Sequence, residues 1–371
     1  MAVVVWYLMA TVKYILFILI NRAGATNFLL NSAADTASYS PIAAGRCSRS
    51  DPKMDPFYET RFGQQMVWQI PPSPKAVLFL AHGKDKEPLS YFDPGPNCRE
   101  CYGFPEDRAA ILEALERSYA VIMVKSVDTY WLPYNVMEWP PTPSQDRTIV
   151  VSIIREWTKE HMLEDLPLVA FGHSSGGNFT TLLTVDLDIK SMILMCSPGE
   201  FAVLHNAIAG VFPPTLFVPM PLDNATTGFF PKVVHAINIL NSKGVLVKEI
   251  DAWPIPIHPH SFSDKIPCLQ AGTSEQIYAA LKSEGWLGEG DYMIKSPYTN
   301  DWEAVLRRHK VLRMCQSWSD MCFAEHIRQV LMAAWAEHSF TSSLNEEIFN
   351  WLDDSMLVGS FEEVRLKMIT D

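Results

Sequence analysis

The chain has 371 residues, of which 48% are hydrophobic, and its formal net charge is -12. This length and composition allow one large buried core. The acidic balance argues against a nucleic-acid partner, because such binding depends on an excess of Lys and Arg. The sequence shows neither a phosphate-binding loop nor a G-x-G-x-x-G unit between a strand and a helix, so we expect neither a nucleotide nor any other cofactor.

The amino-terminal segment is strongly apolar, since residues 3–20 are interrupted by a charge only at Lys13. Two interpretations of residues 1–25 stay open: a membrane anchor, or a signal peptide cleaved near Ala23-Gly24-Ala25. Both predict the secretory or endomembrane route, with possible membrane association through residues 3–20. Residues 26–55 begin with a stretch rich in Ser, Thr and Ala, which predicts a flexible linker or a transit-like segment for the plastid of a complex alga.

A buried strand is predicted over Ala76–Ala81, and it ends in His82-Gly83. The loop after such a strand commonly supplies one backbone N–H to the oxyanion hole of a serine enzyme. Gly83 and Lys84 are therefore the candidate donors on this loop, whereas His82 is interpreted as a structural residue at the strand end.

Cys98 and Cys101 form the one closely spaced cysteine pair among the seven cysteines of the chain. They precede a helix predicted to begin near Pro105. A metal site would need two more ligands at suitable spacing, and none is apparent. We predict a local disulfide, with free thiols and a shared zinc site as the alternatives.

After an amphipathic helix predicted over residues 147–161, the chain carries its most informative motif, Gly172-His173-Ser174-Ser175-Gly176. The apolar run 166–171 precedes it, and helical apolar spacing follows it. Glycines two residues before and after a serine allow the sharp turn from strand to helix that exposes the serine oxygen. Ser174 is thus the predicted nucleophile, and the amide of Ser175 is the second predicted oxyanion donor.

Two further strands are predicted over residues 191–196 and 215–220, and the second leads into Pro221-Leu222-Asp223-Asn224. An acid at this point of the chain, between the serine and a later histidine, suits the residue that orients the base. Asp223 is the candidate, and its alternative role is to cap the helix that follows.

The residues alone leave the base open. His258 and His260 come shortly after a strand predicted over residues 244–250, whereas His338 stands directly before a terminal amphipathic helix around residues 346–352. Either position is compatible with a histidine that takes the proton of Ser174.

The chain resembles the α/β-hydrolase superfamily and, within it, a poorly characterised group of plant and algal proteins. The segments that carry the resemblance are residues 77–83, 98–108, 166–177, 213–223 and 337–351. The resemblance implies an α/β class fold, with a mostly parallel central sheet flanked by helices. It also favours His338 as the base, with His258 as the alternative.

With this assignment, residues 56–262 form the predicted hydrolase core, 263–335 a helical cap insertion, and 336–371 a terminal histidine loop and helix that complete the core. The predicted function is a serine hydrolase acting on a small carboxylic ester or an acyl lipid through Ser174, Asp223 and His338. Two alternatives remain. Pro219 stands where the resembling group commonly has a histidine, so the chain could be an inactive binding protein; an acyltransferase would use the same triad.

Overall fold

The computed structural model describes residues 53–132, 134–135, 142–201, 204, 212–225, 228–267, 269–299, 301–311 and 320–356. The chain divides into a unit of residues 1–42 and a unit of residues 43–371, and every described residue belongs to the second unit. The predicted signal or anchor over residues 1–25, and nearly all of the predicted linker, lie outside the described residues. Within the described part of the chain, no helix has the length and apolar character needed to cross a membrane.

An eight-stranded sheet in the order β1-β2-β4-β3-β7-β8-β9-β10 forms the centre of the described unit. Pairing is antiparallel between β1 and β2 and between β2 and β4, and parallel from β4 to β10. Together with the helices on its two faces, this mostly parallel sheet is the α/β-hydrolase fold that the sequence predicts. The strands are β1 (Phe57–Arg61), β2 (Gln64–Gln69), β3 (Ala76–Ala81), β4 (Tyr119–Val124), β7 (Leu168–His173), β8 (Ile189–Met195), β9 (Thr215–Val218) and β10 (Val247–Glu249), with a separate pair β5 (Tyr134–Asn135) and β6 (Thr142–Pro143).

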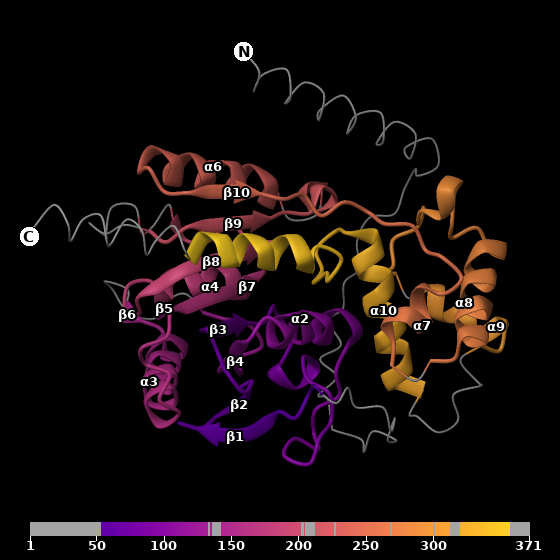
Figure 1. Cartoon of the computed structure of the whole chain (residues 1–371). Helices are drawn as coiled ribbons and strands as arrows, with labels where there is room; N and C mark the ends of the chain where they lie inside the picture. The colour runs from indigo at the N-terminus through magenta and orange to yellow at the C-terminus, as the bar shows by residue number, and fades with distance from the viewer. Residues whose placement is uncertain are drawn as a thin grey trace, which may run out of the picture. The chain divides into compact units, whose positions relative to one another are not determined.

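The central strands are apolar on both sides because helices cover both faces of the sheet (Figure 1). Alternate residues of β3 divide between two cores, with Leu78 and Leu80 in one and Val77 and Phe79 in the other. This division explains why the strand is a continuous apolar run rather than an alternating one. The first face is covered by α2 (Pro105–Glu116) and by helical residues 345–356, and the second by α3 (Gln145–Glu160), α4 (Ser175–Leu183) and α6 (Phe229–Ser242).

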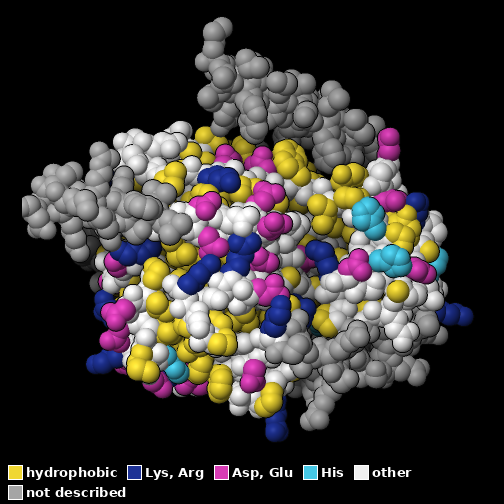
Figure 2. Space-filling model, viewed as in Figure 1, with side chains coloured by type: hydrophobic (Ala, Val, Ile, Leu, Met, Phe, Trp, Pro, Cys, Tyr) yellow, Lys and Arg dark blue, Asp and Glu magenta, His cyan; other side chains and the backbone are white. Residues whose placement is uncertain are grey.

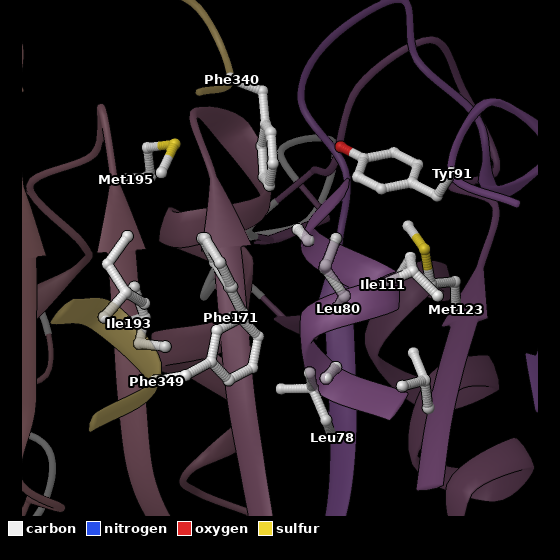
Figure 3. Close-up of a cluster of buried hydrophobic side chains, with 14 of the residues drawn as sticks. Leu78, Leu80, Tyr91, Ile111, Met123, Phe171, Ile193, Met195, Phe340 and Phe349 are labelled. Atoms are coloured by element: carbon white, nitrogen blue, oxygen red, sulfur yellow. The ribbon is translucent and has the colours of Figure 1, made fainter. Parts of the chain in front are cut away.

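Figure 3 shows part of the first core, in which Phe349 of the terminal helical residues lies against strand residues such as Phe171 and Ile193. At the upper end of this core Tyr91 meets the ring of Phe340 edge-on, with 5.6 Å between ring centroids. The terminal segment is therefore part of the main core, although it is far from the strands in the sequence.

A helical segment follows β10 and has a third apolar core of its own. Trp286 and Trp302 are buried in it, as expected of tryptophans at helix contacts. Its last helix packs against α2, so this segment is also joined to the sheet domain. Its elements are α7 (Ser261–Lys265), α8 (Ala271–Ser283), the 3-10 helix η3 (Glu289–Asp291), α9 (Asp301–Arg308) and α10 (Asp320–Trp335).

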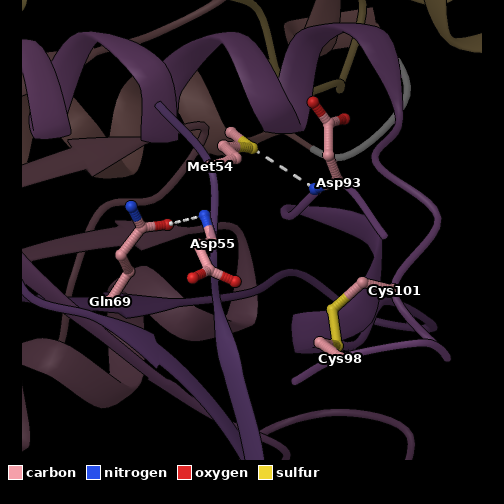
Figure 4. The surroundings of a disulfide bond; sticks show 6 residues. All are labelled: Met54, Asp55, Gln69, Asp93, Cys98 and Cys101. Atoms are coloured by element: carbon pink, nitrogen blue, oxygen red, sulfur yellow. Dashed lines mark hydrogen bonds between the residues drawn. A yellow bond between two sulfur atoms is a disulfide. The ribbon is translucent and has the colours of Figure 1, made fainter. Parts of the chain in front are cut away.

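The loop between β3 and α2 contains the 3-10 helix η1 (Pro88–Ser90) and a disulfide between Cys98 and Cys101 (Figure 4). The structure thus confirms the predicted local disulfide. Nearby, the guanidinium of Arg108 donates two hydrogen bonds to the carboxylate of Asp93, which ties the loop to α2. Because α2 follows this loop directly, both contacts fix the path by which the chain leaves β3.

Acidic and basic side chains are interspersed over the described part of the face that Figure 2 shows. Among the described residues, ion pairs include Arg147 with Asp186 and Arg61 with Glu160. Ion pairs that stay in contact with solvent contribute about 1 kcal/mol or less each. The three apolar cores therefore supply most of the stability of the described unit.

Candidate active site

Ser174 stands between the end of β7 and the beginning of α4, with φ 54° and ψ -119°. A positive φ is unusual for a residue with a side chain, and it persists only where the surroundings enforce it. One such restraint is the hydrogen bond from the amide of Ser174 to the carbonyl of Met195, 2.9 Å long, on the neighbouring strand. The backbone thus makes the sharp turn that the sequence motif predicts.

Glycine is required around this turn because the first residues of α4 lie directly against the backbone of β3 and β7. A Cβ atom on Gly176 would lie 2.2 Å from the carbonyl oxygen of Ala81, and one on Gly172 would lie 2.5 Å from the carbonyl oxygen of Gly176. On Gly177 a Cβ atom would lie 2.4 Å from Cβ of Ser197. The small residues of the motif therefore allow the close approach of helix and sheet, as well as the turn itself.

The structure brings Ser174, His338 and Asp223 into one hydrogen-bonded chain. Oγ of Ser174 lies 2.8 Å from Nε2 of His338, and Nδ1 of His338 lies 2.7 Å from Oδ2 of Asp223. Since a carboxylate can only accept, we assign the proton of the neutral imidazole to Nδ1, which leaves Nε2 to accept from the serine hydroxyl. This is the arrangement in which a histidine can take the proton of a serine nucleophile.

Asp223 belongs to the 3-10 helix η2 (Pro221–Ala225), directly after β9. Its amide donates to the carbonyl of Met220, 3.0 Å away, and its side chain is only 5% exposed. The short helical turn thus aims the carboxylate at His338 and shields it from solvent.

Two aromatic residues outside any sequence motif, Phe229 and Tyr298, hold His338 in place. The ring of Phe229, at the start of α6, stacks on the imidazole with 5.4 Å between centroids and 20° between planes. The hydroxyl of Tyr298 donates to the carbonyl oxygen of His338 over 2.9 Å. No local sequence signal marks either residue, because each meets His338 only through the folding of distant segments.

His258, the alternative base, lies elsewhere. Its side chain is exposed, its amide donates to Oγ of Ser261 over 2.8 Å, and the neighbouring amide of Ile257 donates to the carbonyl of Asp291. His260 is exposed as well and has Nε2 4.0 Å from a carboxylate oxygen of Glu275. Both histidines therefore belong to the surface of the helical segment, and it is His338 that the structure places beside Ser174.

The predicted oxyanion donors belong to two segments that the structure places next to each other, the start of α4 and the end of β3. Ser175 is the first residue of α4, so its amide belongs to the first turn, where backbone N–H groups have no partner within the helix. Gly176 lies against the carbonyls of Ala81 and His82, which places the end of β3 directly beside this turn. Gly83 and Lys84 follow at once, and the bond from Lys86 N to Gly83 O (3.3 Å) folds them into a tight turn.

His82 and His173 are buried histidines behind this turn. His82 lies 2.7 Å from the carbonyl of Gly83 through Nδ1 and accepts from the amide of Ser126 through Nε2, so it acts as a structural link. Burial lowers the pKa of His82 to about 4 and lowers the pKa of His173 well below its ordinary value. His173 is also close-packed on the turn, because a Cβ atom on Gly83 would lie 2.5 Å from its Nδ1.

Potential metal ligands within the described residues come together at Cys196, Asp223 and His338, whose donor atoms lie within 4.8 Å of one another. Two of these residues already bond each other, and the thiol of Cys196 lies 3.6 Å from the carbonyl of Ser339. Burial, aided by the charge of Asp223, raises the pKa of this thiol well above its ordinary value. Since metals bind the thiolate, we interpret Cys196 as a protonated residue packed behind the hydrogen-bonded chain.

No protein-family model and no curated protein matches this sequence. Solved structures similar to this chain include esterases, a dienelactone hydrolase and a protein described as a putative α/β-hydrolase from Agrobacterium tumefaciens. A thermostable esterase has a TM-score of 0.39 at 15% identity over 56% of this chain, and the match spans 56% of that esterase's own length. A carboxyl esterase from Bacillus coagulans has a TM-score of 0.37 at 13% identity, over 54% of this chain and 90% of its own. A dienelactone hydrolase from Anabaena variabilis has a TM-score of 0.38 at 12% identity, over 54% of this chain and 87% of its own length.

Proposed function

We propose that this protein is a serine hydrolase that cleaves carboxylic esters. The observation that carries the proposal is the hydrogen-bonded chain Ser174–His338–Asp223, with Ser174 held at positive φ on the turn between β7 and α4. A serine hydroxyl is a weak nucleophile by itself, and a neutral imidazole within hydrogen-bond distance is what activates it.

In the proposed reaction the oxygen of Ser174 attacks the ester carbonyl while Nε2 of His338 takes its proton. The tetrahedral intermediate collapses to an acyl-serine, and His338 returns the proton to the departing alcohol. Water then repeats the sequence on the acyl-serine and releases the acid. Asp223 keeps the imidazole in the required tautomer and stabilises its protonated form.

The oxyanion of each intermediate would accept from the amides of Ser175 and of the Gly83-Lys84 turn. Removing one such donor typically costs about 3 kcal/mol in the barrier. Because these donors are backbone groups on a strand end and a helix start, they need no reorganisation during the reaction.

We infer an apolar ester, such as an acyl lipid, as the substrate class. Phe229 and Tyr298 lie next to His338, so an incoming ester would meet aromatic surface beside the reacting atoms. In this proposal the helical segment from α7 to α10 is the cap of the site, and residues 3–20 bring the enzyme to a membrane of the secretory route. We also propose that the protein belongs to the group of plant and algal α/β-hydrolases that its sequence resembles.

The test is labelling of the full-length protein with a fluorophosphonate probe, together with hydrolysis of p-nitrophenyl esters of increasing acyl length. We expect labelling of the native protein and none of Ser174→Ala. His338→Ala should lower kcat/KM about 10⁴-fold or more, because a serine without its base loses most of its reactivity.

His258→Ala is the matched control, since it removes an exposed histidine of the same chain. Its kcat/KM should stay within twofold of the native value. A folded native protein that neither reacts with the probe nor hydrolyses any of the esters would contradict the proposal and favour a binding protein. Labelling without net hydrolysis, but with transfer of the acyl group to an added alcohol, would favour an acyltransferase.

A further inference from the structure

Two adjacent carboxylates, Glu106 and Asp107, are fully buried at the beginning of α2. The first turn of a helix favours negative charge, because its N–H groups point toward the side chains there. That effect is weak compared with the cost of removing a carboxylate from water, so each needs specific partners. In both cases the partners come from other segments of the chain.

Glu106 bonds to the segment that carries the candidate base. Its Oε2 accepts from the amide of Ser342 over 2.7 Å and from the hydroxyl of the same residue. Ser342 lies on the stretch that runs from His338 to the terminal helical residues 345–356. Glu106 therefore anchors the far end of the loop on which His338 sits.

Glu106 also joins α2 to two helices of the segment that follows β10. Its Oε1 pairs with Nζ of Lys265 in α7, and its amide donates to Oε1 of Gln329 in α10 over 2.8 Å. The packing of α10 on α2 agrees with these contacts, and Figure 1 shows the two helices side by side.

Asp107 bonds to the loop that follows β3. Its Oδ2 accepts from Oγ of Ser90 over 2.9 Å and lies 3.3 Å from Nζ of Lys86. The amide of Lys86 closes the turn on the carbonyl of Gly83, so this contact reaches the turn that holds the candidate oxyanion donors.

We propose that Glu106 and Asp107 are positioning residues for the reaction at Ser174. Glu106 sets the loop of His338 and docks α7 and α10, while Asp107 sets the Gly83-Lys84 turn. The inference rests on the proposed function and deepens it: one acidic dipeptide aligns the base and the oxyanion donors on either side of the nucleophile. Alignment matters because a displacement of about 1 Å in a catalytic group can cost on the order of 100-fold in rate.

The experiment compares Glu106→Gln, Asp107→Asn, Ser342→Ala and Ser90→Ala in the full-length protein. Every rate is divided by the concentration of active sites, which is titrated with the fluorophosphonate. The amide variants keep the size of the side chain and remove its charge, whereas the two serine variants each remove one hydroxyl. Glu113→Gln is the matched control, because Glu113 lies on the same helix and makes a partly exposed pair with Arg117.

We expect kcat per active site to fall about 10-fold to 100-fold in Glu106→Gln and Asp107→Asn, with KM changed less than threefold. The affinity for a trifluoromethyl ketone, which becomes a tetrahedral oxyanion at Ser174, should fall in parallel with kcat/KM. Ser342→Ala and Ser90→Ala should show smaller losses of the same kind, and Glu113→Gln should stay within twofold of the native protein.

A purely structural role would lower the fraction of active sites and leave kcat and ketone affinity per site unchanged, which would overturn the inference. Should the charge-removing variants not fold, unchanged values in Ser342→Ala and Ser90→Ala would overturn it equally. If the proposed function itself is wrong, the native protein will not react with the fluorophosphonate. That result would contradict both the proposed function and the inference. A native protein that reacts with the fluorophosphonate, together with variants whose kcat is unchanged, would contradict the inference alone.

Discussion

The two sides of Ser174 are constructed in different ways. The elbow side consists of β3 with its following turn, β7 and the start of α4, and its tightest contact is with backbone atoms, where Gly176 meets the carbonyls of Ala81 and His82. The base side consists of Asp223, Phe229, Tyr298 and His338, which come from distant segments. The side chains of Asp223 and Phe229 contact the imidazole of His338, and the hydroxyl of Tyr298 bonds to its backbone carbonyl.

This difference predicts how each side responds to change. Backbone atoms within a sheet cannot move without disturbing their strand pairing, so a substitution that places a new side-chain atom against this backbone should act mainly on stability. A side-chain contact on the base side can be lost while the fold persists, so a substitution there should act on rate. Each of the following predictions tests one side.

Gly176→Ala tests the elbow side and should have the largest effect on stability. The new Cβ atom would lie 2.2 Å from the carbonyl oxygen of Ala81 and 2.6 Å from that of His82. Because both obstacles are backbone, we expect the free energy of unfolding to fall by on the order of 3 kcal/mol. Urea denaturation followed by circular dichroism would measure the change.

Gly272→Ala is the matched control, since Gly272 lies in α8 and a Cβ atom there would meet nothing within 4 Å. Alanine should raise the free energy of unfolding by about 0.5 to 1 kcal/mol through its better helical propensity. Equal stability of the two variants would show that the backbone contacts at Gly176 are not tight.

The same contrast explains how much of the site could be predicted from the sequence. The elbow is local: a buried strand, a glycine-flanked serine and a helix follow one another, so the position of Ser174 and the strand at Ala76–Ala81 agree with the structure. The residues alone do not distinguish His338 from His258, because both follow the last strand; the resemblance to the α/β-hydrolase superfamily favours His338. The catalytic roles of Ser174 and His338 stay predictions.

Other parts of the structure have no chemical motif in the sequence that marks them. Strand β4 is apolar and fully buried, yet it has no chemical motif to draw attention to it. Tyr298 and Glu106 each act on a residue that lies far along the chain, and nothing in their immediate neighbours indicates that partner. Contacts of this kind depend on the packing of α7 to α10 against the sheet domain, which local patterns do not specify.

The stability of the elbow side should depend on pH through His82. The pKa of this residue is about 4 in the folded protein, against an ordinary value of 6.5. Between these values the unfolded chain binds more protons than the folded one, so stability is lost as the pH falls from about 6.5 toward about 4. The contribution of His82 to this loss is about 2 kcal/mol at pH 5.

Urea denaturation of native protein and His82→Gln at pH 7 and pH 5 would measure this contribution. Glutamine can still donate and accept a hydrogen bond, but it does not titrate, so its stability should fall less between the two pH values. His260→Gln, which removes a histidine whose side chain is 55% exposed, should behave as the native protein does. The same pH dependence in native protein and His82→Gln would assign the effect to other groups, of which His173 is the first candidate because burial lowers its pKa in the same direction.

Tyr298→Phe tests the base side and should have the smallest effect. It removes the hydrogen bond to the carbonyl of His338 and keeps the ring, and a bond of this kind contributes about 1 kcal/mol. If that contact aligns the imidazole, kcat for ester hydrolysis should fall about fivefold with KM nearly unchanged, and the free energy of unfolding should fall by about 1 kcal/mol or less. Tyr292→Phe is the matched control, because Tyr292 is an exposed tyrosine of the same segment. A loss of stability without a change in kcat would mean that Tyr298 only packs the helical segment onto the sheet domain. A fall in kcat would mean that the helical segment, through Tyr298, helps to align the imidazole of His338.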